Sequence, residues 1–471
     1  MKHNLNFFQK KAKIGWIWGS YGQVIQKVLI MLVSIIMARI LEPSDFGLIA
    51  SVSILIIVAQ QVIDSGISDR IIQKKTITET DYSTFFFCNL FISIFILILF
   101  IFIAKPISNF YENNLINNVV ICFGVIIFFM NAGRIQWVIL NRNLKFKTCI
   151  IIRTLSVIFG CFFGLTMALN DFGFWALVGQ QMSAAITLTL MYWIVLPWLP
   201  KEKPSWAAVK DIYSFGTPII ISESIRSSID QFINIIIAKN FSQSNLGYYD
   251  RGKFIPENIH NSIKMIFGQT NFAVLSHLKS NNNNLSTTFL DFLKIRSVII
   301  IILLGSIFIC ANDIVLILLG QKWMASVWFL KTLCLSFAFL SFFISNQELL
   351  KALGKIRLLF KLNILSALIQ IIMVLLGFIY WEIKGIIIGD IISKALCLYF
   401  AIYFISRDGI VSFSDQTKTI FKSFFICIIP LISLFLVQFF VSNNLIIRVI
   451  LCMVTFFIAC IIFLKKNKFN Y

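Results

Sequence analysis

The sequence predicts an all-α integral membrane protein that crosses the bilayer about fourteen times. Of its 471 residues, 58% are hydrophobic and 13% are charged, whereas a soluble domain carries about 25% charge. Apolar runs of about 20 residues, long enough to span a bilayer as a helix, recur along the whole chain. Runs of this length indicate helices rather than the shorter strands of a membrane barrel.

The apolar runs set the order of the expected helices. Their ranges are 14–37, 46–63, 82–104, 115–139, 149–169, 173–196, 213–238, 247–275, 292–311, 326–349, 359–380, 385–405, 420–441 and 445–464. The longest hydrophilic stretch, residues 276–286, contains four consecutive asparagines. It is too short to form a domain outside the membrane.

The basic residues predict how these helices are oriented. The net charge is +20, with 41 Lys and Arg against 21 Asp and Glu. Twenty-five basic residues fall in the tails and alternate loops, around positions 2–13, 70–75, 142–147, 201–210, 279–294, 351–361, 407–422 and 465–468. Only five fall on the other side: Arg39, Lys105, Lys239, Lys322 and Lys384. The positive-inside rule therefore places both termini in the cytoplasm, and the charge does not indicate a nucleic-acid partner.

An internal repeat is suggested at an offset of 200 residues. The segment ARILEPSDFG at 38–47 resembles AKNFSQSNLG at 238–247, and six predicted helices separate the copies. So short a similarity can arise by chance in a chain of this composition. If it is a repeat, it predicts two pseudo-symmetric six-helix lobes, residues 1–200 and 201–410. Residues 411–471 would then carry helices 13 and 14 and a cytoplasmic tail.

Polar side chains mark the first helix of each lobe. The spacing of these residues places them on one face of each helix; they are Gln23, Gln26, Lys27, Glu223, Arg226 and Asp230. An ionised group at the centre of a bilayer costs about 2.5–3.5 kcal/mol. We therefore expect these residues to line a hydrated cavity between the lobes. The alternative is that Arg226 and Asp230, one turn apart, only neutralise each other inside the bundle.

Further candidates for the cavity lie on other helices: Asp64, Arg153, Arg251 and Lys253. For those near the membrane ends, Asp64, Arg251 and Lys253, contact with the membrane interface is an equal alternative. Asp390 and Lys394 have i, i+4 spacing and can form a buried pair.

No chemistry-bearing motif accompanies these polar helices. The ten cysteines lie mostly inside apolar runs and include no CxxC pair, and the three histidines are scattered. The sequence thus predicts no catalytic residue, no metal site and no cofactor.

Several segments carry a family resemblance. These are ARILEPSDFGLIA (38–50), DSGISDRIIQKK (64–75), FCN (87–89), AKPISNFYENNLI (104–116), NRNLKFK (141–147), GFWALVGQQ (173–181), YSFGTPIIISES (213–224), NLGYYDRGKFIP (245–256) and LLGQKWMASV (318–327). In order and spacing they resemble Wzx-type oligosaccharide flippases of the multidrug/oligosaccharidyl-lipid/polysaccharide transporter superfamily. The similar branch contains colanic-acid and teichuronic-acid exporters, and the resemblance covers roughly residues 10–405.

This resemblance implies a protein of the bacterial inner membrane whose two lobes work by alternating access. Its substrate would be a polyprenyl-diphosphate-linked oligosaccharide unit for O-antigen, capsule or exopolysaccharide synthesis. Membrane lipid would surround it, and a polysaccharide polymerase and glycosyltransferases would act beside it. Glu223 and the asparagine run depart from the family pattern, and the sugar stays open.

Two other classes compete with a flippase. A multidrug or cation antiporter shares the architecture, but its cavity should be lined mainly by carboxylates. A membrane polymerase or glycosyltransferase should carry a large external loop or an acidic catalytic motif. The cations Lys27, Arg226, Arg251 and Lys253 suit a diphosphate better. We therefore expect a transporter rather than an enzyme.

Overall fold

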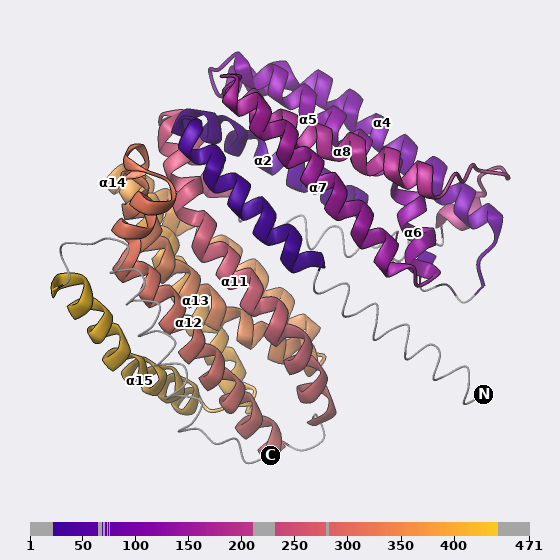
Figure 1. Ribbon diagram of the computed structural model, residues 1–471. Helices are drawn as coiled ribbons and strands as arrows, with labels where there is room; N and C mark the ends of the chain where they lie inside the picture. Colours follow the sequence, from indigo (N-terminus) through magenta and orange to yellow (C-terminus); the bar gives the residue numbers. More distant parts are fainter. Residues whose placement is uncertain are drawn as a thin grey trace. The chain divides into compact units, whose positions relative to one another are not determined.

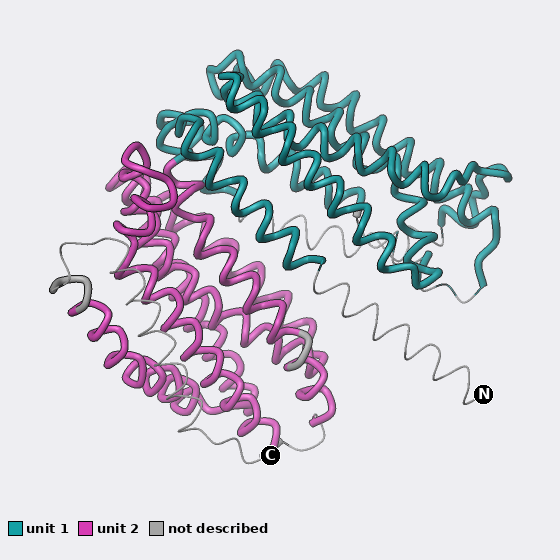
Figure 2. The backbone as a smooth tube through the Cα atoms, in the orientation of Figure 1, with its two compact units in different colours: residues 1–247 teal, residues 248–471 magenta. Residues whose placement is uncertain are grey.

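The computed structural model describes residues 22–210, apart from 65–67, 69–70, 73 and 75, and also residues 231–278 and 282–440. The regular structure in these ranges is helical, and no strand occurs among the described residues (Figure 1). The chain divides into two compact units, residues 1–247 and 248–471 (Figure 2).

The first unit is a bundle of long helices. They are the helix Gly22–Ile40, α2 (Pro43–Asp64), α4 (Glu79–Phe110), α5 (Leu115–Ala132), α6 (Arg134–Arg142), α7 (Phe146–Leu169), α8 (Trp175–Val195) and α10 (Phe232–Asn240). One apolar core joins α2, α4, α5 and α8 and includes Val52, Phe100, Phe123 and Val178. Other large apolar side chains, such as Phe102 on α4, are exposed. An outer surface this apolar fits lipid rather than water.

The second unit contains most of α11 (Gln243–His277), whose first turn holds the boundary at Gly247. The later elements are α12 (Asn282–Leu318), the 3₁₀ turn η2 (Gln321–Trp323), α13 (Ser326–Ala352), α14 (Ile356–Arg407) and α15 (Phe413–Phe440). Helix α13 is the central one, because most of its side chains are buried.

Helix α14 is a tight hairpin of two membrane helices. The helical backbone is interrupted at Trp381 and Glu382, where Glu382 has a φ of 50°. A Cβ on Gly385 would lie 1.9 Å from the Gly377 carbonyl oxygen, and one on Gly389 would lie 2.2 Å from the Met373 carbonyl oxygen. The two halves therefore pack backbone to backbone, as small residues four apart allow in membrane helices.

The two copies of the repeat meet in a reciprocal contact. A Cβ on Gly47 would lie 1.8 Å from the Gln243 carbonyl oxygen, and one on Gly247 would lie 1.9 Å from the Pro43 carbonyl oxygen. Gln243 follows Pro43 by 200 residues, and Gly247 follows Gly47 by the same number. The two segments thus make the same contact with each other: each glycine packs against the carbonyl oxygen of the residue four positions before the other glycine. The lobes at 1–200 and 201–410 themselves stay a prediction.

The all-α membrane fold expected from the sequence is confirmed. Nine helices in the described ranges are long and apolar enough to cross a membrane. The break between the expected helices at 359–380 and 385–405 coincides with the interruption of α14. Most of the range 213–238 and all of 445–464 lie outside the described residues. The total of fourteen crossings therefore stays a prediction.

One expected boundary is wrong. Helix α12 begins at Asn282, ten residues before the start expected for the helix at 292–311. Leu285, Phe289 and Leu293 recur every four residues and are buried. Their burial on one face stabilises the start of this helix, although the segment is polar on average.

Candidate functional site

The helix Gly22–Ile40 carries three of the predicted cavity residues. Gln26 is half-buried, and its Nε2 donates a hydrogen bond to Oγ1 of Thr154 on α7 at 2.9 Å. Gln23 and Lys27 are exposed. Because Gln23 and Lys27 are four residues apart, they form one stripe of the helix beside the stripe that faces α7.

Arg153 immediately precedes Thr154 on α7 and is also exposed. The contact from Gln26 therefore brings a polar residue of the first described helix to the turn of α7 that carries Arg153. Among the described residues, Arg153 makes no hydrogen bond or ion pair with another predicted site residue.

The side chains of four predicted residues lie outside the described part of the structure. Glu223, Arg226 and Asp230 lie outside the described residues. Asp64 is the last residue of α2, but its side chain lies outside the described part. Their position in a cavity stays a prediction.

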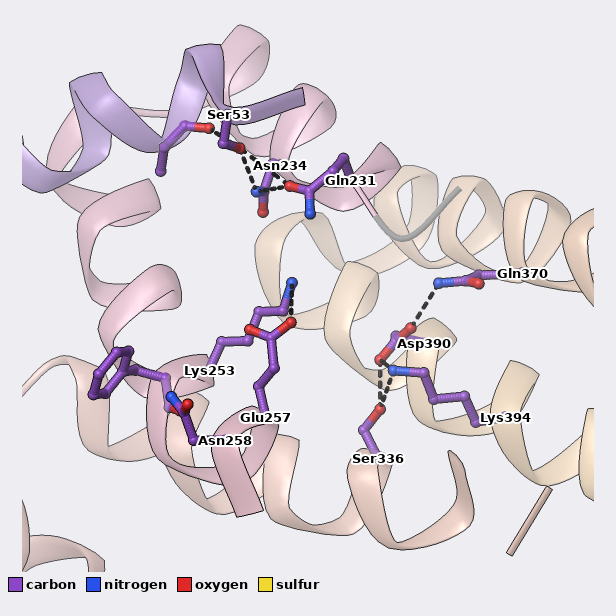
Figure 3. Close-up of polar contacts among 12 residues, drawn as sticks. Ser53, Gln231, Asn234, Lys253, Glu257, Asn258, Ser336, Gln370, Asp390 and Lys394 are labelled. Atoms are coloured by element: carbon purple, nitrogen blue, oxygen red, sulfur yellow. Dashed lines mark hydrogen bonds and ion pairs between the residues drawn. The ribbon is translucent and has the colours of Figure 1, made fainter. Parts of the chain in front are cut away.

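A buried amide cluster lies close to Asp230 in sequence (Figure 3). Asn234 Nδ2 donates to Gln231 Oε1 at 2.6 Å and lies 3.3 Å from Ser53 Oγ, which is 3.1 Å from Gln231 Oε1. The cluster joins α2 to the start of α10, and Gln231 and Asn234 are both buried. Asn234 Oδ1 has no hydrogen-bond partner among the described residues. The cluster therefore contains one buried acceptor oxygen, Asn234 Oδ1, that no described residue bonds.

The predicted cations of α11 are paired with carboxylates. Arg251 Nη2 lies 2.7 Å from Asp250 Oδ2, and its guanidinium carbon is 4.9 Å from the centre of the Phe254 ring. Lys253 Nζ lies 3.8 Å from Glu257 Oε1, one turn further along. The free cationic character that the sequence suggested for Arg251 and Lys253 is thus reduced by adjacent acids.

The i, i+4 pair on α14 is confirmed and is part of a larger network (Figure 3). Asp390 is 1% exposed, and its Oδ2 is 2.8 Å from Lys394 Nζ and 2.5 Å from Ser336 Oγ. Its Oδ1 accepts from Gln370 Nε2 at 3.1 Å. Lys394 Nζ also lies 5.0 Å from the centre of the Phe337 ring. These bonds tie α13 to both halves of the α14 hairpin.

A second buried ion pair joins α12 to α13. Arg296 is fully buried, and its Nη1 lies 2.8 Å from Glu348 Oε2. Arg296 Nε and Nη2 have no hydrogen-bond partner in the described part of the chain. On α11, His260 Nδ1 is 2.6 Å from Ser341 Oγ. Helix α13 thus makes polar contacts with three neighbouring helices.

Several of these residues were not predicted from the sequence. Arg296 is a cation near the start of an apolar run, two residues after Lys294, and its position inside the expected helix 292–311 could have marked it. Ser336 and Gln370 gave no such signal, since single polar residues are common in membrane helices.

These arrangements hold charges and amides inside membrane helices by pairing them. In lipid an unpaired polar group costs several kcal/mol, so such groups face partners or a hydrated space. The described residues contain no group of three or more His, Cys, Asp or Glu placed to hold a metal. The helices and the polar clusters within them define a multi-pass membrane protein.

Comparison with known proteins gives the family. Residues 36–328 match the family described as "Polysaccharide biosynthesis protein", and the chain belongs to that family. An "Uncharacterized membrane protein in cps region" of Klebsiella pneumoniae is 24% identical over 83% of this chain and 81% of its own length. The "Lipopolysaccharide biosynthesis protein WzxC" of Escherichia coli K12 is 22% identical over 78% and 75%. The "Succinoglycan biosynthesis transport protein ExoT" of Rhizobium meliloti is 23% identical over 84% and 79%.

Solved structures show the same fold. The lipid II flippase MurJ, in an inward closed conformation, matches with a TM-score of 0.73 at 14% identity, covering 96% of this chain and 99% of that one. A multidrug resistance transporter of the MATE family, in its inward-facing conformation, matches with a TM-score of 0.63 at 16% identity, covering 84% and 96%.

Proposed function

We propose that this protein is a flippase that moves polyprenyl-diphosphate-linked oligosaccharide units across the bacterial inner membrane by alternating access. The observation that carries the proposal is the family match over residues 36–328 of a multi-pass membrane protein. The names of WzxC and ExoT, a lipopolysaccharide biosynthesis protein and a succinoglycan transport protein, support a role in polysaccharide export.

The polar side chains of the helices suit such a substrate. Sugars need hydrogen-bonding groups in a wet lumen, and the amides of the exposed Gln23 and the half-buried Gln26 are of that kind. A diphosphate needs cations, and the exposed Lys27 and Arg153 are available to it. Arg226, which lies outside the described residues, is a third candidate for binding the diphosphate. The polyprenyl chain would stay in the surrounding lipid.

The setting follows from the same proposal. Both termini would lie in the cytoplasm, as the distribution of Lys and Arg predicts. Glycosyltransferases would supply the lipid-linked unit on the cytoplasmic side, and a polymerase would consume it outside. The protein itself would break and form no covalent bond.

A cation antiporter is the rival, because a MATE transporter shares the fold. The test uses inverted membrane vesicles that contain the full chain and a radiolabelled polyprenyl-diphosphate sugar. We expect the sugar to become protected from an added glycosidase only in vesicles with the protein. Uptake of a cationic dye in the same vesicles, without protection of the sugar, would contradict the proposal and support the antiporter.

A further inference from the structure

A cavity in the second unit has the chemistry of a phospholipid site. It lies between α12 and α15 and has a volume of about 490 Å³. Its lining residues are Leu290, Asp291, Lys294, Thr419, Lys422, Phe425 and Ile426. The volume falls in the usual range for small-molecule sites, roughly 300–1,000 Å³.

The packing of the two helices explains why the cavity forms where it does. Helices α12 and α15 contact each other closely beyond it, where Cys427 Sγ is 3.8 Å from the Val298 carbonyl oxygen. One turn further on, Leu431 fills the space beside Gly305. The cavity is lined by residues that precede Val298 on α12 and Cys427 on α15.

Two lysines of the lining, Lys294 and Lys422, give the cavity its positive charge. Lys294 is half-buried on α12, and Lys422 is exposed on α15. The basic-residue pattern assigns both to the cytoplasmic side, close to the expected membrane ends of their helices. Basic pockets between membrane helices on that side bind the headgroups of anionic lipids.

The apolar part of the lining leads into the membrane. Phe425 and Ile426 are 66% and 41% exposed, and the apolar surface continues along α15 through Ile429 at 76%. Acyl chains would lie on this surface while the phosphate sits between the lysines. Asp291 places an acceptor beside the cations, which suits a headgroup with hydroxyl donors.

We propose that the cavity between α12 and α15 binds one anionic diacyl phospholipid of the inner leaflet, of the phosphatidylglycerol type. The lysine ammonium groups would hold the phosphate, and Asp291 would accept hydrogen bonds from the glycerol hydroxyls. None of its lining residues belongs to the polar clusters on α11, α13 and α14.

The experiment measures lipid binding to the full-length protein in detergent by native mass spectrometry. Phosphatidylglycerol and phosphatidylcholine of the same acyl chains are the probes. We expect phosphatidylglycerol to bind wild-type protein more tightly, and each of Lys294→Gln and Lys422→Gln to weaken it about fivefold. Lys418→Gln, one turn before Lys422 and outside the cavity, is the matched control and should change binding little.

Several outcomes would overturn the proposal. Equal binding of the two lipids, or unchanged binding by the Lys294→Gln/Lys422→Gln variant, would show that the cavity is not a site for anionic phospholipid. An equal loss in Lys418→Gln would show a diffuse basic surface instead. Displacement of the phospholipid from these lysines by an added polyprenyl diphosphate would assign the cavity to the transported substrate. A circular dichroism spectrum like that of the wild type would show that each variant is folded.

Discussion

At the scale of single residues, Lys27 best tests the proposed substrate contact. It is exposed on a membrane helix, beside Gln26, which is fixed against α7. A charge-assisted hydrogen bond to a phosphate is worth about 1.5–3 kcal/mol. We expect Lys27→Ala to lower flipping at subsaturating substrate by roughly ten- to a hundredfold.

The measurement is the vesicle protection assay, with protein amounts equalised by immunoblot. Lys105→Ala is the matched control, since Lys105 is an exposed lysine of α4 on the predicted external side. Flipping by Lys27→Ala at the wild-type rate would exclude a role for this lysine in binding substrate.

Asp390 and Lys394 test whether a buried pair is only structural. Removing one partner leaves an uncompensated charge inside the bundle, which costs about 3–5 kcal/mol. We expect Asp390→Asn and Lys394→Met each to lower the thermal midpoint of the purified protein clearly. The double variant Asp390→Leu/Lys394→Met should recover most of that loss, because no charge then remains buried.

Flipping by the double variant separates the two roles of the pair. Near-normal flipping would mean that the network only holds α13 against α14. Restored stability without flipping would show that the charges take part in the transport cycle. A double variant as unstable as the single ones would contradict the pairing itself.

At the scale of elements, the α14 hairpin depends on its glycines. A Cβ on Gly385 would lie 1.9 Å from the Gly377 carbonyl oxygen. Gly385→Ala must push the two halves apart, so we expect a loss of about 1–3 kcal/mol in stability. Gly389 lies against Met373, one residue before Asp390, so the same shift should loosen the Asp390–Gln370 bond.

The control is Gly268→Ala on α11. The nearest atom to a Cβ there is Glu348 Oε1 at 3.4 Å, an ordinary contact. This variant should be neutral or slightly stabilising, since alanine favours a helix over glycine. Equal thermal midpoints for Gly385→Ala and Gly268→Ala would contradict the close packing of the hairpin.

The same elements show what sequence alone can predict. The turn of α14 was predictable because Glu382 and Lys384 interrupt an apolar run. The start of α12 was not, because its buried stripe of Leu285, Phe289 and Leu293 is hidden among polar residues. Average hydropathy does not detect an apolar stripe along a helical segment whose other faces are polar.

The polar contacts also divide into those that the sequence could predict and those that it could not. The Asp390–Lys394 pair followed from its spacing along one helix. The pairs Ser336–Asp390 and Arg296–Glu348 join residues 54 and 52 positions apart in sequence, on different helices. A single sequence contains no information on which helix faces meet, so these contacts needed the structure.

At the scale of the whole molecule, loops assigned to the same side of the membrane contact each other within each unit. In the first unit, Lys239 Nζ is 2.7 Å from Glu112 Oε1, and both positions are assigned outside. This bond lowers the pKa of the Glu112 carboxyl. In the second unit, Lys355 Nζ is 2.8 Å from Asp408 Oδ2, and both are assigned to the cytoplasm.

These contacts lead to a prediction of topology that reporter fusions can test. We expect alkaline phosphatase to be active when fused after Glu112 or Gly320 and inactive after Leu144 or Gly354. Each of these residues lies in a loop between helices, where a backbone φ above zero ends or precedes the regular structure. A fluorescent protein fused after Lys466 should fold and fluoresce, as it does in the cytoplasm. The reason is the charge, because the opposite orientation would require twenty-five basic residues to be moved across the membrane, and basic loops are normally retained in the cytoplasm.

Phosphatase activity after Leu144 or Gly354 would show that the orientation is the opposite of the one predicted. Loss of alternation between Gly320 and Gly354 would instead remove a crossing from the second unit and refute the count of fourteen.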